Sequence, residues 1–386
     1  MMNESEVEKT VRDIARRALV ASRQLAAIPT AKKNAALIRI AELLEAPQSQ
    51  PMLLEANERD LQAGAAQGLS EAMLDRLRLT PQRIHSMVEG TRQVVALEDP
   101  VGKVLETKTH RKGFTIEKVR VPIGVIGIVY ESRPNVTIDC AVLCLKSGNA
   151  TILRGGREAY NSNMALARII QKGLEETGLP ADVVQLIPTT ERYALSVLLK
   201  LDDCVHCLIP RGGEGLIRFV AENARMPVIK HYKGVCNVYL DAAAERKTAV
   251  QVTVNAKCQR PSVCNAAENL IVHQSVLESI FPDVAKTLKE NGVQLRVDEP
   301  AAKVLQAFGA IPFTMATDED YHTEYLDKII SIKTVPDLGA AIQFVNTYGS
   351  GHSDAIITTD AEAAERFQTE VDSATVYWNV STRFTD

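Results

Sequence analysis

Short apolar runs alternate with helical segments between residues 123 and 210 of this 386-residue chain. The run "IGVIGIVY" precedes the helical segment "VTIDCAVLCLKSG", and "ATILRGG" precedes "YNSNMALARIIQKGLEETG". Neighbouring parallel strands need a crossover connection, and the connecting helices then cover both faces of the sheet. The sequence therefore predicts an α/β protein that contains a parallel sheet.

The first hundred residues follow other patterns. Residues 5–97 show helical periodicity with short polar joints, and residues 104–121 alternate apolar and polar side chains around a Lys-Gly break. We expect an N-terminal group of helices followed by a β-hairpin. A chain of this length with 46% hydrophobic residues can bury two domain cores.

Charge and cysteine content exclude several classes of function. There are 44 basic and 48 acidic residues and no dense Lys/Arg run, so we expect no nucleic-acid partner. No apolar run reaches 18 residues and the N-terminus has no signal-peptide pattern, so we expect no membrane partner and a cytoplasmic location. The seven scattered cysteines are typical of a reducing compartment in which thiols stay free.

Two glycine-rich turns, "LRGGREAY" and "LIPRGGEGLIRFV", connect predicted strands to predicted helices. Open α/β sheets bind ligands at the carboxyl ends of their strands, and a helix N-terminus there offers free N–H groups to a phosphate. Arginine beside a nucleotide site favours a ribose 2′-phosphate, so the turns indicate NADP rather than NAD. The alternative is that the glycines only make tight turns and the arginines are solvated. The candidate cofactor-binding residues of the turns are Arg154, Gly155, Gly156, Arg157, Arg211, Gly212 and Gly213.

The sequence Arg133-Pro134-Asn135 interrupts the apolar strand and the helix that follows it. The chain must turn there and expose polar side chains at the carboxyl end of the strand. Asn135 is therefore a candidate amide donor for an oxyanion. The alternative is that Asn135 only caps the helix, since asparagine is a favoured N-cap residue.

Cysteines that could do chemistry occur in two places. In "NAKCQRPSVCNAAENLIVH", Cys258 and Cys264 lie six residues apart, which suits neither a CxxC redox pair nor a zinc knuckle and leaves a single nucleophile or a buried pair. Cys204, His206 and Cys207 suggest half of a zinc site, but the chain has no second CxxC or HxxxH partner, so we expect no metal.

The longer motifs resemble one known family. They are "VPIGVIGIVYESRPNVTIDCAVLCLKSGNATILRGGREAYNSN", "VNAKCQRPSVCNAAENLIVH", "TEYLD", "YGSGHSDAI" and "VDSATVYWNVSTRF". Together they resemble the gamma-glutamyl phosphate reductase family of the aldehyde dehydrogenase superfamily. The resemblance implies a Rossmann-type NADP-binding domain (residues 1–103 and 122–233), an oligomerisation hairpin (104–121) and an α/β catalytic domain (234–386). Family members continue past "STRFTD", so the catalytic domain is expected to lack the C-terminal tail.

The same resemblance implies a reaction. Cys264 occupies the nucleophile position of QRPxxCN, and Cys258 stands where the family usually has threonine and is expected to be a packing residue. The thiolate attacks L-glutamate 5-phosphate, phosphate leaves, and NADPH reduces the resulting thioester to L-glutamate 5-semialdehyde, the second step of proline biosynthesis from glutamate. Asn135 aligns with the oxyanion-binding asparagine of the superfamily, with two residues inserted.

Further roles follow from the alignment of shorter segments. If Gly234 matches the second glycine of the superfamily's ELGGK motif, His231 replaces the glutamate that activates water in hydrolytic aldehyde dehydrogenases. Glu324 matches the glutamate that holds the nicotinamide ribose, and Arg154 matches a lysine near the adenine ribose. An anionic substrate needs basic residues near the nucleophile, although each could instead form a structural ion pair. These candidates are Arg133, Lys257, Arg260 and Arg383.

Partners and rival functions are also implied. The hairpin predicts a homo-oligomer, and the unstable acyl phosphate suggests functional association with a glutamate kinase. Within enzymes, an acylating aldehyde dehydrogenase that uses coenzyme A would share Cys264, Asn135 and the cofactor turns. From another class, the chain could be a catalytically silent partner that docks a glutamate kinase.

Overall fold

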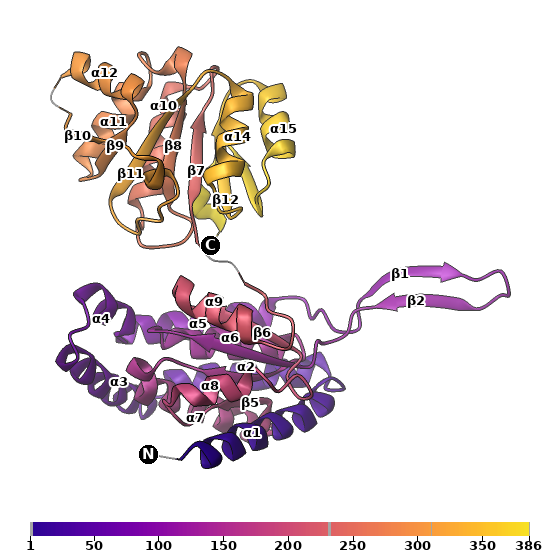
Figure 1. The fold of residues 1–386 in the computed structure, drawn as a ribbon. Coiled ribbons are helices and arrows are strands. Elements are labelled where there is room, and N and C mark those ends of the chain that lie inside the picture. The colour runs from indigo at the N-terminus through magenta and orange to yellow at the C-terminus, as the bar shows by residue number, and fades with distance from the viewer. Residues whose placement is uncertain (1–2, 231–232, 310, 386) are drawn as a thin grey trace. The chain divides into compact units, whose positions relative to one another are not determined.

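A computed structural model describes residues 3–230, 233–309 and 311–385 of the chain. The chain divides into two compact units, Met1–His231 and Tyr232–Asp386 (Figure 1). His231, which the sequence places at the position of the water-activating glutamate, lies outside the described residues.

The first unit is built on a four-stranded parallel sheet of order β5-β4-β3-β6. Its strands are β3 (Val125–Tyr130), β4 (Ala150–Arg154), β5 (Val184–Leu186) and β6 (Cys207–Arg211). Its α-helices are α1 (Glu4–Leu25), α2 (Thr30–Glu45), α3 (Ser49–Ala66), α4 (Glu71–Leu77), α5 (Pro81–Ala96), α6 (Asn135–Lys146), α7 (Tyr160–Glu176), α8 (Arg192–Leu198) and α9 (Glu214–Asn223). The predicted alternation of strands and helices is confirmed.

Side-chain alternation along β3 explains why this sheet is covered on both faces. Ile126, Ile128 and Tyr130 pack into a core that includes residues of α2, α5, α6 and α7. Val125 and Val129 point the other way, into a core that includes residues of α1 and α8. Because successive side chains of a strand face opposite sides, a strand with apolar residues at every position needs two apolar layers.

The predicted hairpin is present as β1 (Val104–Thr109) and β2 (Thr115–Val119), paired antiparallel. Both strands are exposed along their whole length and extend from the first unit as a two-stranded ribbon (Figure 1). An isolated two-stranded ribbon is marginally stable in water. Its apolar residues, including Leu105 (48% exposed) and Ile116 (49% exposed), lack cover within the described chain.

The second unit contains a seven-stranded parallel sheet of order β10-β9-β11-β8-β7-β12-β13. Its strands are β7 (Cys236–Leu240), β8 (Ala267–His273), β9 (Gln294–Val297), β10 (Phe313–Met315), β11 (Ile329–Val335), β12 (Ser353–Ile357) and β13 (Thr375–Trp378). Its α-helices are α10 (Arg246–Cys258), α11 (Phe281–Glu290), α12 (Glu299–Phe308), α13 (Asp318–Tyr321), α14 (Leu338–Tyr348) and α15 (Ala361–Glu370).

A buried carboxylate lies within this second sheet. Asp354 on β12 is fully buried and accepts hydrogen bonds from the backbone N–H of Asn237 at 2.8 Å, from the Asn237 amide at 2.7 Å, and from the Ser373 hydroxyl. Burial raises the pKa of Asp354 to about 6, although these hydrogen bonds oppose the shift. A carboxyl group whose folded-state pKa is raised contributes most stability when protonated, and that contribution is lost as the pH rises through about 6.

We therefore expect Asp354→Asn to gain stability relative to the wild type as the pH is raised. The asparagine keeps an acceptor for Asn237 and cannot ionise. The difference in free energy of unfolding should grow by on the order of 2 kcal/mol between about pH 4 and pH 7 and then level off. Urea denaturation of both proteins across this pH range measures the difference, and a difference that does not depend on pH would contradict the prediction.

Candidate active site

The predicted cofactor residues of the first unit lie where the parallel strands of its sheet end. Arg154 is the last residue of β4, Arg211 is the last residue of β6, and β3 lies between these two strands. Asn135 begins α6 shortly after β3 ends. Because all four strands are parallel, these residues lie at the carboxyl ends of adjacent strands, where open α/β sheets hold ligands.

The glycines of the two turns allow close approach by the protein's own side chains. A Cβ atom on Gly155 would lie 2.1 Å from the amide nitrogen of Asn163, and one on Gly156 would lie 2.0 Å from the Glu158 carboxylate. At Gly212 the corresponding distance to the Glu131 carboxylate is 2.4 Å. Glycine at these three positions therefore leaves room for the protein's own side chains, whether or not a phosphate approaches them.

The prediction that the helix N-termini behind these turns offer free N–H groups is wrong for α7. The buried carboxylate of Asp60, on α3, accepts from the backbone N–H groups of Asn161 at 3.1 Å and Ser162 at 2.7 Å. Before α9, the Gly213 N–H donates to Glu131 at 2.9 Å. A carboxylate satisfies the positive end of a helix as a phosphate does. Binding of an anion at these strand ends therefore depends more on arginine side chains than on the N-termini of the helices.

Arg154 has the environment that an anion-binding arginine needs. Its guanidinium donates to the carbonyl oxygens of Gly155 at 3.0 Å and Thr190 at 3.4 Å, which hold it between the loops that follow β4 and β5. Its Nε atom is buried and has no hydrogen-bond partner among the described residues. Arg157 and Arg211, which belong to the two glycine-rich turns, are exposed to solvent. These residues fit an anionic nicotinamide cofactor.

Asn135 is the first residue of α6, whose N-cap is Pro134, so the helix-cap alternative is wrong. The Asn135 amide instead donates from Nδ2 to the carboxylate of Asp139, one turn along the helix, at 2.9 Å. Burial raises the pKa of Asp139, although this hydrogen bond opposes the shift. Because a carboxylate only accepts, the contact fixes Nδ2, the donor end of the amide, toward Asp139 and leaves its second N–H for another acceptor.

The turn before Asn135 is held in an unusual conformation. Ser132 has a φ of 44°, in a region that non-glycine residues rarely occupy. Its N–H and hydroxyl both donate to Glu158, at 2.6 and 2.8 Å. Glu158, which is not among the predicted site residues, therefore fixes the start of the segment that presents Asn135. Arg133 lies exposed in the same segment.

In the second unit, Cys264 lies in the turn between α10 and β8 and is partly buried. The turn packs directly on the chain before β7. A Cβ atom on Gly234 would lie 1.9 Å from the carbonyl oxygen of Cys264 and 2.7 Å from its Cα atom. The buried thiol of Cys236 also contacts the Cys264 carbonyl oxygen, at 3.2 Å. The backbone of Cys264 is thus fixed by close contact with a neighbouring strand.

The same turn also contacts a 3-10 helix, Thr382–Thr385. The Thr382 hydroxyl donates to the carbonyl oxygen of Asn265 at 2.7 Å. Arg383 donates to the side chain of Gln259 at 3.1 Å and to the Asn265 side chain. Arg383 is a predicted substrate-binding residue, and its guanidinium lies on the turn that carries Cys264. No local pattern indicated this contact, which joins residues more than 100 positions apart.

Cys258 and Lys257 end α10. Cys258 packs against the hydrophobic core of this unit, and burial raises the pKa of its thiol. Lys257 has no exposed side-chain surface and forms a 2.6 Å ion pair with Glu268, which is also fully buried. Burial raises the pKa of Glu268 although Lys257 opposes the shift. Lys257 is therefore an ion-pair residue in this structure rather than a substrate contact, while Arg260 is exposed two residues beyond Cys258.

The remaining candidate, Glu324, lies in the loop between α13 and β11. The strands that follow Gly234, Cys264 and Glu324 are all parallel, so these three residues lie at the amino edge of the seven-stranded sheet. In the second unit these residues thus lie at the amino ends of the strands, whereas in the first unit the candidate residues lie at the carboxyl ends. Glu324 itself is partly buried.

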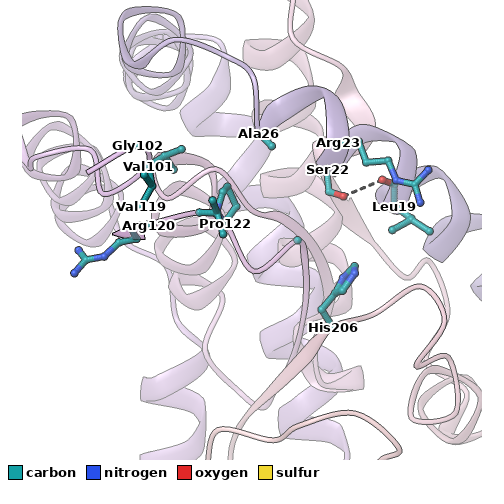
Figure 2. Close-up of a pocket in the computed structure, with 12 residues that line it drawn as sticks. Leu19, Ser22, Arg23, Ala26, Val101, Gly102, Val119, Arg120, Pro122 and His206 are labelled. Carbon is teal, nitrogen blue, oxygen red and sulfur yellow. Dashed lines mark hydrogen bonds between the residues drawn. The ribbon is translucent and has the colours of Figure 1, made fainter. Parts of the chain in front are cut away.

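A cavity of about 420 Å³ in the first unit contains none of the predicted site residues. Figure 2 shows residues that line it, including Ser22 on α1, Pro122 after the hairpin, and His206 before β6. The Nδ1 atom of His206 accepts a hydrogen bond from the Val125 N–H at 3.0 Å, which uses that nitrogen within the protein. We assign no catalytic role to this cavity.

Three absences hold for the part of the chain that the structure describes. No group of three or more histidine, cysteine, aspartate or glutamate side chains is arranged to hold a metal ion. All seven cysteines lie in this part, and none forms a disulfide. None of its helices combines the length and apolar character that crossing a membrane requires.

Residues 3–311 match the model of the aldehyde dehydrogenase family, and the chain belongs to that family. It is an oxidoreductase that acts on an aldehyde group, and members of this family use nicotinamide cofactors. Within it, the chain belongs to the gamma-glutamyl phosphate reductases, as curated relatives and a solved structure establish.

The relatives match along nearly the whole chain. The gamma-glutamyl phosphate reductase of Opitutus terrae is 53% identical over 383 residues, which cover 99% of this chain and 89% of the relative. The crystal structure of the Thermotoga maritima enzyme of that name has a TM-score of 0.92 and 41% identity, and the match covers 97% of this chain and 89% of that one. An acetylating aldehyde dehydrogenase from Geobacillus thermoglucosidasius, at 16% identity and a TM-score of 0.69, shares the fold over 99% of this chain and 88% of its own.

Proposed function

We propose that the chain reduces L-glutamate 5-phosphate to L-glutamate 5-semialdehyde and phosphate with NADPH, the second step of proline biosynthesis from glutamate. The observation that carries the proposal is the fixed turn of Cys264. The thiol lies within QRPSVCN and its backbone is packed against Gly234. The 53% identity to a gamma-glutamyl phosphate reductase supports the choice of substrate.

The residues of the chain contribute distinct steps. The Cys264 thiolate attacks the acyl carbon, a sulfur–carbon bond forms, and the carbon–oxygen bond to phosphate breaks. This leaves a thioester on Cys264, and the nicotinamide cofactor would supply the hydride that reduces it. The thiohemiacetal on Cys264 then releases the aldehyde and regenerates the thiol. Asn135 donates its free amide N–H to the oxyanion of the tetrahedral species, a type of donor whose loss costs about 10²- to 10³-fold in rate.

We assign cofactor binding to the first unit, with Glu324 of the second unit holding the nicotinamide ribose. Arg154 supports NADP over NAD because its guanidinium lies at the carboxyl ends of the strands, with a buried Nε atom that no described residue pairs with. Arg157, Arg211 and the four glycines shape these strand ends. We assign the covalent steps to Cys264, within residues 234–386, and the oxyanion contact to Asn135.

The substrate carries a phosphate, an α-carboxylate and an α-ammonium group. Arg133 and Arg260 are exposed and remain our candidates for its anionic groups. Arg383 acts on the substrate only indirectly in this proposal, through the turn that it holds. Because the acyl phosphate is unstable, we propose that a glutamate kinase supplies it in functional association with this enzyme. The free cysteines suit a cytoplasmic location.

The exposed hairpin supports a homo-oligomer in which a second copy covers its apolar residues. We expect Ile116→Lys to shift the protein toward smaller species, since Ile116 is 49% exposed on a ribbon whose strands are exposed along their whole length. Light scattering coupled to size exclusion measures the mass. Thr107→Lys, on the neighbouring strand of the same ribbon, is the matched control. An unchanged mass for Ile116→Lys would remove the hairpin from the interface.

The proposed reaction is tested in reverse. Purified protein is mixed with glutamate 5-semialdehyde, inorganic phosphate and NADP, and NADPH formation is followed by absorbance. We expect turnover that requires phosphate and is faster with NADP than with NAD. Turnover that requires coenzyme A instead of phosphate would favour the acylating alternative, and no turnover with any acyl acceptor would favour the catalytically silent one.

A further inference from the structure

The loop that carries Glu324 is anchored at the next residue. The Tyr325 hydroxyl donates to the carboxylate of Asp320 at 3.1 Å and lies 2.6 Å from the Ser331 hydroxyl. Asp320 lies on α13, before the loop, and Ser331 lies on β11, after it, so the tyrosine hydroxyl ties the loop to both of its flanks. The position of Glu324 therefore depends on the side chain beside it.

A second anchor follows immediately. The backbone N–H of Leu326 donates to the carboxylate of Glu268 at 3.4 Å. Leu326 has a φ of 54°, a strained conformation for leucine that persists only where its surroundings hold it. Two successive residues after Glu324 are thus fixed, one by its side chain and one by its backbone.

Glu268 reaches the loop from an irregularity in β8. Cys236 pairs with Ala267, whereas the next residue of β7, Asn237, pairs with Asn269. Glu268 is therefore the extra residue of a β-bulge, and bulges next to active sites redirect side chains. Its redirected carboxylate contacts the loop and, at 2.6 Å, the ammonium group of Lys257.

Charges also surround the ring of Tyr325. The Lys257 ammonium lies 5.9 Å from the ring centroid, and the Arg296 guanidinium lies 4.8 Å from it. A buried ion pair such as Lys257–Glu268 is weak evidence for stability, because desolvation offsets its attraction. Its placement between the Cys264 turn and the Glu324 loop indicates another role.

We propose that Tyr325, Glu268 and Lys257 form a positioning network that sets Glu324 relative to the turn of Cys264. Lys257 lies on the helix that leads into this turn, and Glu268 follows Cys264 by four residues on the strand that leaves it. The network thus joins both flanks of the nucleophile turn to the loop. The inference rests on the proposed function, in which Glu324 binds the cofactor ribose.

The test is a double-mutant cycle in the full chain, read out as NADPH affinity by fluorescence titration. Tyr325→Phe keeps the ring contacts and removes the hydroxyl. We expect NADPH affinity to fall about tenfold, the size of effect that follows the loss of one hydrogen bond to a charged group, with the fold retained and the rate of Cys264 alkylation unchanged. Glu324→Gln should also weaken binding. Because Tyr325 acts through Glu324, the double variant should bind NADPH no more weakly than Glu324→Gln alone.

Matched variants keep the test decisive. Tyr193→Phe removes a tyrosine hydroxyl that lies 3.5 Å from the Glu8 carboxylate in the other unit, and it should leave NADPH affinity unchanged. Lys257→Met combined with Glu268→Leu removes both buried charges together and should reproduce the tenfold loss without leaving a charge unpaired. The proposal would be overturned if the affinity losses of Tyr325→Phe and Glu324→Gln multiply in the double variant. It would also be overturned if Tyr325→Phe and the Lys257→Met, Glu268→Leu variant both bind NADPH with wild-type affinity.

Failure of the network can be separated from failure of the proposed function. NADPH titration needs no turnover, so the cycle can be completed even if glutamate 5-semialdehyde is not a substrate. If Glu324→Gln binds NADPH with wild-type affinity, both the proposed ribose-binding role of Glu324 and the positioning network are wrong. Phosphate-dependent turnover by the wild type would still support the proposed reaction in that case.

Discussion

Cys264→Ala is expected to abolish phosphate-dependent reduction of NADP by glutamate 5-semialdehyde, while Cys258→Ala retains it. The thiolate forms the covalent intermediate, and loss of a nucleophile typically costs about 10⁴-fold or more in turnover. Cys258 packs against the core of the second unit, and burial disfavours its thiolate by raising its pKa. Initial rates of NADPH formation for the two variants and the wild type measure the effect.

Melting temperatures serve as the control for both substitutions, because an unfolded variant would also be inactive. If Cys264→Ala keeps more than a tenth of the wild-type rate, the thioester mechanism is wrong. If only Cys258→Ala is inactive while folded, the two cysteines have exchanged the roles proposed for them.

Gly234→Ala is expected to have the next largest effect. Its added Cβ atom would lie 1.9 Å from the Cys264 carbonyl oxygen, and because this neighbour is backbone, the turn itself must move. A displacement of about 1 Å at a reacting atom can cost on the order of 10²-fold in rate. We expect at least that loss in turnover, together with slower alkylation of Cys264.

Gly90→Ala is the matched control, since a Cβ atom there meets nothing within 4 Å. It lies within α5, where alanine favours the helix over glycine, so we expect unchanged turnover and equal or higher stability. A fully active Gly234→Ala protein would show that the turn tolerates displacement and that its close contact with the chain before β7 has no catalytic importance.

The parts of the fold that could be predicted are those with local signals. The run 123–130 is apolar at nearly every position, and the structure confirms a strand that feeds two cores. The hairpin was predicted from its own alternation. Its environment could not be, because whether a second copy covers Ile116 depends on surfaces that the local sequence does not describe.

The candidate site shows the same division. Glycine turns indicated which sheet edge holds Arg154 and Arg211, but not that Asp60 occupies the N-terminus of α7. That carboxylate lies 102 residues before the Ser162 amide that it binds. Likewise, the QRPSVCN motif indicated Cys264, whereas the contacts of Lys257 and Arg383 could not be predicted, because their partners, Glu268 and Asn265, become neighbours only in the folded chain.

The contact between Thr382 and the turn of Cys264 has a consequence for the timing of folding. It closes a loop of 117 residues, and contacts between distant positions form late because loop closure must precede them. The helix α10 and strand β8 can form around the thiol well before residues 382–385 dock. During refolding, Cys264 should therefore acquire its final reactivity in a late phase, after most secondary structure has appeared.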